Sequence, residues 1–238
     1  MFQYAIARAL SEHYQSTFSL DRSWFNAPQT ETTPRPYQLE FLKIQAVAES
    51  KVDFPRKPNR LMRVLQKLPS FGPIVYYQQN AFTFDAGLLN LNGLGQRDLF
   101  LFGYWQAFPY IEPIRFILQQ EFKTKQPISD HYQSYLESIR ASDAVMLHIR
   151  RGDYVNSPSA AKFHGALDLK YYQQAIEALL LNKPNAHFFI FSDDLPWAKE
   201  ALPKDLQITF VENALQADAA AQELQLMYAC KHHIIANS

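Results

Sequence analysis

Short apolar runs of strand length alternate with amphipathic stretches of helix length through the second half of the chain. The runs are almost continuously apolar, which is the pattern of strands buried on both faces of a sheet. The expected strands span 144–149, 187–191, 208–211 and 234–236, and the expected helices span 168–180, 197–202 and 217–229. Because such alternation requires right-handed crossovers, we predict a parallel sheet with helices packed on it.

The first half of the chain has a weaker pattern. Apolar positions from Phe2 to His13 recur at helical spacing and predict a helix that ends near Tyr14. A polar segment with scattered prolines, 23–58, is interpreted as a loop-rich insertion, and a disordered loop is the alternative. Further strands are expected at 17–20, 74–77, 82–84 and 99–104, and further helices at 61–68, 112–122 and 129–139.

The last of these helices leads directly into the strand that begins at Ala144, so we place a domain boundary near Ala141. The prediction is therefore an α/β protein with an N-terminal domain over 1–141 and a C-terminal domain over 142–238.

Composition narrows the classes of function. The chain has 238 residues and a formal net charge of +0, so nothing predicts general attraction to nucleic acid, and any anion site must be a local cluster. Its single cysteine, Cys230, excludes an internal disulfide and a cysteine-based metal cage. No apolar run approaches the roughly 20 residues that span a bilayer, and the start lacks the pattern of a signal peptide. These features predict a soluble, cytoplasmic protein.

Charged residues follow the central strand of the C-terminal half. Arg150 and Arg151 come directly after Ile149, and Gly152 and Asp153 follow them. Functional groups of α/β sheets gather at the carboxyl ends of the strands, and two guanidiniums can bind a diphosphate through forked hydrogen bonds. The alternative is a solvated junction whose arginines pair with nearby carboxylates.

Two further groups follow expected strands. Asp193 and Asp194 could hold a divalent metal, or they could cap the next helix. Tyr104, Trp105 and Gln106 combine aromatic rings with an amide, which suits a sugar; packing in the core is the alternative for the aromatic residues.

The stretch from His148 to Tyr154, HIRRGDY, resembles the His-x-Arg-Arg-Gly-Asp-Tyr signature of the α-1,2-fucosyltransferases, glycosyltransferase family eleven. Further stretches resemble that family in the same order: Met1–Ala5, Phe102–Gln106, Leu169–Tyr172, Phe191–Asp194 and Cys230–Ser238. The resemblance implies two Rossmann-like domains in a GT-B-type arrangement. It also implies inverting transfer of fucose from GDP-fucose to the 2-hydroxyl of a terminal galactose, with no metal and no other cofactor.

The resemblance also implies roles for individual residues. Arg150 is expected to be the principal diphosphate contact, and Arg151 is expected to orient Asp153 or close the pocket. Asp153 is either the catalytic base or a partner of the arginines, and a carboxylate beside arginines is a weak base. The acceptor glycan is expected at Tyr104, Trp105 and Gln106. The complete set expected to bind the donor is His148, Arg150, Arg151, Ser192, Asp193, Asp194, Asn237 and Ser238.

The two ends of the chain fall inside motifs of that family. Met1 corresponds to a position within a glycine-rich turn, and Ser238 precedes the expected pair of tryptophans, so we expect a sequence truncated at both ends. Animal members carry an N-terminal membrane anchor, and its absence here favours the bacterial type. A bacterial enzyme of this type is expected in the cytoplasm, either free or in peripheral contact with the inner face of the membrane.

Two other functions compete with this prediction. Protein O-fucosyltransferases use the same donor and share a related arginine motif, but they match the stretches at 191–194 and 232–238 less well. Arg151-Gly152-Asp153 is also the tripeptide of cell-adhesion ligands. Such ligands display it on an exposed, often disulfide-framed loop, whereas here it follows a buried strand, which disfavours an adhesion module.

Overall fold

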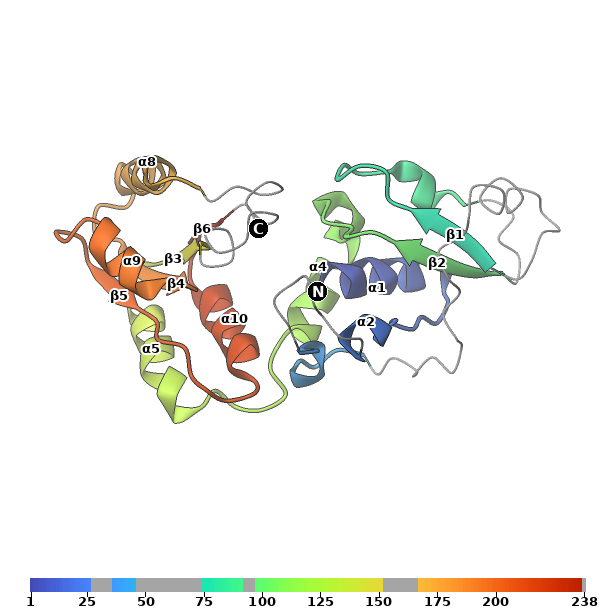
Figure 1. The fold of residues 1–238 in the computed structure, drawn as a ribbon, viewed down its shortest axis with the longest axis horizontal. Coiled ribbons are helices and arrows are strands. Elements are labelled where there is room, and N and C mark those ends of the chain that lie inside the picture. Colours follow the sequence, from blue (N-terminus) through green and yellow to red (C-terminus); the bar gives the residue numbers. More distant parts are fainter. Residues whose placement is uncertain (27–35, 46–73, 92–96, 152–166, 237–238) are drawn as a thin grey trace. The chain divides into compact units, whose positions relative to one another are not determined.

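The computed structural model describes residues 1–26, 36–45, 74–91, 97–151 and 167–236. The chain divides into two compact units. The first comprises Met1–Pro28 with Lys43–Phe122, and the second comprises Gln29–Leu42 with Lys123–Ser238. Figure 1 labels the elements of both units.

The second unit is built on a parallel sheet. Its strands are β3 (Ala144–Ile149), β4 (His187–Ser192), β5 (Ile208–Phe210) and β6 (His232–Ile234), in the order β5-β4-β3-β6. Every pairing in this sheet is parallel. The helices are α5 (Asp130–Ala141), α8 (Leu169–Leu180), α9 (Leu195–Ala201) and α10 (Ala219–Ala229) (Figure 1). The predicted α/β class with a parallel sheet is confirmed.

Alternate residues of the central strands face two separate cores. Val145 and Leu147 of β3 pack with Tyr172 of α8 and Ala198 of α9. Ala144 and Met146 point the other way and pack with residues of α5 and α10, among them Leu136 and Leu226. Because successive side chains of a strand point to opposite faces, a continuously apolar strand fills both cores.

Helix α5 belongs to this second unit, although it precedes the domain boundary predicted near Ala141. It packs beside α10, where the hydroxyl of Tyr132 donates a hydrogen bond to Glu223 at 2.7 Å and accepts one from the amide of Ala214 at 3.0 Å. Which function each unit carries stays a prediction.

Cys230 packs in the core between the sheet and helices α5 and α10. Its side chain is buried, and burial raises the pKa of its thiol to about 12. Since the thiolate is the reactive form, we expect the native protein to resist a disulfide-exchange reagent at pH 8 and to react fully in denaturant. Spectrophotometric titration of the thiol in both states would check this. Rapid reaction of the native protein would contradict the packing described here.

The first unit joins helix α1 (Phe2–Tyr14) to a two-stranded parallel sheet of β1 (Ile74–Gln78) and β2 (Asp98–Phe102). Ile6 and Leu10 of α1 pack with Leu88, Trp105 and Tyr110 in its core. The remaining helical elements are short: α2 (Ser23–Asn26), η2 (Ala86–Leu89), η3 (Phe108–Tyr110), η4 (Glu112–Ile114) and α4 (Arg115–Glu121). A further turn, η1 (Leu39–Phe41), belongs to the second unit.

Two strand predictions in this half were wrong. Residues 16–20 have no regular structure, and residues 81–83 form bends rather than a strand. Phe82 is largely exposed, and Phe84 packs its ring against Tyr110 with 4.8 Å between centroids. The partner of β1 is instead β2, twenty residues further along the chain. The helix predicted at 61–68 lies outside the described residues.

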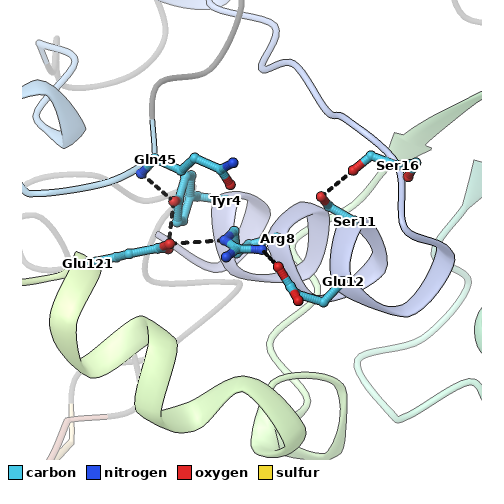
Figure 2. Close-up of polar contacts among 7 residues, drawn as sticks. All are labelled: Tyr4, Arg8, Ser11, Glu12, Ser16, Gln45 and Glu121. Atoms are coloured by element: carbon cyan, nitrogen blue, oxygen red, sulfur yellow. Dashed lines mark hydrogen bonds and ion pairs between the residues drawn. The ribbon is translucent and has the colours of Figure 1, made fainter.

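A buried polar network joins α1 to α4 within the first unit (Figure 2). The Arg8 guanidinium donates to Glu121 at 2.9 Å and also contacts Glu12 one turn along α1. The hydroxyl of Tyr4 donates to Glu121 at 2.7 Å and accepts from the amide of Gln45 at 2.9 Å. Burial, with the hydrogen bond to Glu121, raises the pKa of Tyr4, so the phenol stays protonated and serves as a donor.

Candidate functional site

The carboxyl ends of β3 and β4 bring four charged residues together. Ile149 and Ser192 are register partners at the ends of these neighbouring strands. The residues that follow are therefore adjacent: Arg150 and Arg151 after β3, and Asp193 and Asp194 after β4. The edge of the sheet predicted from the sequence is thus lined by two cations and two carboxylates.

Each arginine has an aspartate partner. Nη1 of Arg150 lies 3.4 Å from Oδ2 of Asp193, and Nε of Arg151 lies 3.6 Å from Oδ2 of Asp194. The backbone amide of Arg151 donates to Oδ1 of Asp193 at 2.9 Å. The Arg150 side chain is 21% exposed and that of Arg151 is 32% exposed, so both cations remain accessible to a ligand.

Asp194 also begins helix α9. Its Oδ1 accepts the amide of Trp197 at 3.2 Å, and the hydroxyl of Ser192 accepts the amide of Asp194 at 2.9 Å. The capping role that the sequence offered as an alternative is therefore present, and the same carboxylate also pairs with Arg151.

Trp197 was missed by the sequence analysis. The Arg151 guanidinium lies over its ring, 4.7 Å from the centroid, and such cation–π contacts hold an arginine in one orientation. The only signal in the sequence was its position three residues after the capping aspartate. Arg151 is thus fixed on two sides, by Trp197 and by Asp194.

His148 is the last residue but one of β3, and the charges of Arg150 and Asp193 both act on its ring. Burial lowers the pKa of its imidazole, the Arg150 charge lowers it further, and Asp193 partly opposes them. The ring is therefore neutral near pH 7 and can both donate and accept a hydrogen bond.

Three residues of the predicted site lie outside the described residues: Asp153, Asn237 and Ser238. Their predicted roles stay predictions. Among the residues that the structure describes, no group of three or more His, Cys, Asp or Glu side chains is arranged to hold a metal ion.

The residues predicted to bind the acceptor follow β2 in the first unit. Tyr104 is 63% exposed, whereas Trp105 is only 1% exposed and packs in the core with Tyr110. Gln106 is exposed. Trp105 has a φ of 59°, a left-handed conformation that is uncommon for a bulky residue and that often marks a functional turn.

Gln79, which the sequence analysis did not single out, holds this segment in place. Its side-chain oxygen accepts the backbone amides of Tyr104 at 2.9 Å and Trp105 at 3.0 Å, and its backbone amide donates to the Phe102 carbonyl at 2.8 Å. Gly103 permits this contact, because a Cβ there would lie 2.5 Å from Cβ of Gln79. A turn glutamine has no distinguishing sequence pattern, so only the structure reveals it.

An α/β unit with a parallel sheet and helices packed on it fits the Rossmann-like class of glycosyltransferase domains. The comparison with known families gives the particular one. The family model "Glycosyl transferase family 11" matches residues 77–238, and the chain belongs to this family.

Individual relatives agree with that assignment. The chain is 30% identical over 243 residues to an alpha-1,2-colitosyltransferase of Escherichia coli, covering 100% of this chain and 80% of that protein. It is 29% identical to the O-antigen biosynthesis glycosyltransferase WbnK of Escherichia coli, over 100% of this chain and 83% of that protein. It is 28% identical to the galactoside 2-alpha-L-fucosyltransferase SEC1 of Bos taurus, over 57% of this chain and 38% of that protein.

No solved structure matches this chain. None of the described helices has the length and apolar character needed to span a bilayer.

Proposed function

We propose that this protein transfers fucose from GDP-fucose to the 2-hydroxyl of a terminal galactose, with inversion at the anomeric carbon and without a metal ion. The family supports glycosyl transfer, and several relatives are named as α-1,2-fucosyl or α-1,2-colitosyl transferases. The observation that carries the donor half of the proposal is the pair of accessible arginines at the edge of the C-terminal sheet. A GT-B-type arrangement of two Rossmann-like domains forms part of the same proposal.

In the proposed reaction, the bond between the fucose anomeric carbon and the β-phosphate oxygen breaks, and GDP leaves with the electron pair. The acceptor 2-oxygen forms the new bond to that carbon, and its proton passes to a base. Negative charge grows on the departing diphosphate, so a preorganised cation stabilises the transition state more than the ground state.

Arg150 is the residue assigned to that charge. It follows the strand directly, and its partner Asp193 is held at 3.4 Å, longer than the 2.7–2.9 Å typical of a strong charge-assisted hydrogen bond. A diphosphate carries more charge than one carboxylate and can therefore displace Asp193 from Arg150. Arg151, held by Trp197 and Asp194, is assigned to orienting Asp153 or closing the pocket.

Ser192, Asp193, Asp194 and His148 are assigned to the nucleoside end of the donor. A neutral imidazole can donate to or accept from the polar edge of guanine, and carboxylate oxygens can accept from its N–H groups. Asn237 and Ser238 are assigned to the phosphates, and Asp153 is kept as a candidate base.

A second donor is favoured by one observation. The relative that covers this whole chain at 30% identity is named a colitosyltransferase. Colitose is fucose without its 3-hydroxyl, so a site for one sugar fits the other except at that position.

The proposal is tested by incubating the full chain with GDP-fucose and lactose and assigning the linkage of the product by NMR. We expect an α-1,2-linked fucose, formed at the same rate with EDTA as without it. A second reaction contains GDP-colitose in place of GDP-fucose. A third contains folded peptide domains in place of lactose. Activity with the peptide domains alone would favour a protein O-fucosyltransferase, and loss of turnover in EDTA would reject the metal-independent step.

A further inference from the structure

The carboxyl ends of β1 and β2 form a hollow within the first unit. Its volume is about 350 Å³, and it is lined by residues 78–82 on one side and 102–104 on the other. Gln78 and Phe102 are register partners at the ends of the two strands, so the hollow occupies the edge of the sheet where parallel strands present functional groups. Its size lies at the low end of the roughly 300–1,000 Å³ of ligand pockets.

The walls of this hollow are uncharged. Gln78 and Asn80 supply exposed amides, and Phe82 and Tyr104 supply aromatic rings whose centroids lie 6.1 Å apart. Phe82 is 65% exposed, so its ring face is available. A diphosphate or a nucleotide would need a cation that the lining residues do not include.

The wall formed by residues 102–104 is preorganised. Gln79 accepts both amides of the turn after Gly103, and the side chain of Gln3 at the start of α1 donates to the Gly103 carbonyl at 3.2 Å. The side-chain nitrogen Nε2 of Gln79 is buried and has no hydrogen-bond partner within the described part of the chain. Because the backbone of residues 102–104 is already fixed, binding a ligand there costs less conformational entropy. After a small shift of its side chain, Nε2 of Gln79 could donate a hydrogen bond to a polar ligand.

From these observations we infer that the hollow binds a pyranose ring of the acceptor glycan, with Phe82 stacked on the apolar face of the sugar and Gln78 and Asn80 bonded to its hydroxyls. The inference deepens the proposed function, on which it rests. It adds Phe82, Gln78 and Asn80 to the predicted acceptor residues, and it assigns Gln79 a positioning role through its hold on Tyr104.

Phe82→Ala tests the inference, with Phe82→Tyr as the conservative variant that keeps the ring. Phe116→Ala is the matched control, because Phe116 is an exposed aromatic residue of the same unit that does not line the hollow. Lactose binding is measured by saturation-transfer NMR and acceptor KM by initial rates, beside GDP binding and the thermal midpoint of each variant. We expect Phe82→Ala to weaken lactose binding about tenfold, the order that loss of one aromatic contact gives. GDP binding should stay within twofold, and Phe82→Tyr and Phe116→Ala should bind lactose as the wild type does.

The outcomes separate this inference from the proposed function. If the wild type transfers fucose to lactose and Phe82→Ala binds lactose equally well, the inference is wrong and the proposed function stands. If a panel of other neutral glycans binds in a Phe82-dependent way while lactose does not, the hollow is a sugar site and the proposed acceptor is wrong. If no glycan binds the wild type, both are overturned.

Discussion

Replacing Arg150 with alanine is expected to lower kcat about 10²–10³-fold, which is the usual cost of removing one preorganised donor from a developing negative charge. The guanidinium lies at the carboxyl end of β3 with 21% of its side chain exposed, and its ion pair with Asp193 is long at 3.4 Å. Initial rates with GDP-fucose and lactose would measure the loss, and circular dichroism would show that the structure persists.

Two variants sharpen this test. Arg140→Ala removes an exposed arginine at the end of α5 in the same unit and should leave kcat unchanged. Arg150→Lys keeps the charge but loses the fork, so it should recover only part of the rate. An Arg150→Ala enzyme within a few-fold of the wild type would remove Arg150 from the proposed mechanism.

Arg8→Met is expected to cost about 3 kcal/mol of the free energy of unfolding, because removing one partner of a buried ion pair leaves the other charge uncompensated. The Arg8 and Glu121 side chains are 10% and 13% exposed, and methionine can fill the space of the arginine stem. After the change, Glu121 keeps only its contact with the Tyr4 hydroxyl in the network of Figure 2. Urea unfolding followed by circular dichroism would measure the loss, and hydrogen exchange would locate it in α1.

Glu12→Gln is the matched control. It removes the other charge that contacts Arg8, but the Glu12 side chain is 48% exposed and one turn away on the same helix. Exposed pairs of this kind contribute less than about 1 kcal/mol. Equal losses from Arg8→Met and Glu12→Gln would show that the link between α1 and α4 is not the stabilising contact.

The second half of the chain could be predicted well because its strands are buried on both faces. The run 144–149 is apolar on both faces, so its pattern cannot be mistaken for that of an amphipathic helix. The helix expected at 168–180 is also found, and Asp168 caps it by accepting the amide of Tyr171 at 2.9 Å. The last strand was placed two residues too late. His232 and His233 begin β6, and the apolar pattern gave no reason to include them.

The first half was harder because its aromatic runs are not all buried. Phe82 and Phe84 resemble strand residues in sequence, yet both are exposed and no strand pairs with them in the described chain. The pairing of β1 with β2 depends on contacts between distant segments, which a local pattern cannot encode.

The candidate site was likewise predictable only in part. The sequence predicted that Arg150 and Asp193 each follow a strand, and strand ends can be inferred from local pattern. That these strands are neighbours in register, with the charges 3.4 Å apart, required the structure. Trp197 and Gln79 were missed because each acts through a contact made by folding rather than through a motif.

The pairing of β3 with β4 has a consequence for insertions and deletions. Removing Ile149 would either turn Val145 and Leu147 toward the opposite core, or move Arg151 into the position that Arg150 holds beside Asp193. Members of a variant library that change the length of this strand should therefore be lost even where every amino acid retained is tolerated at its own position.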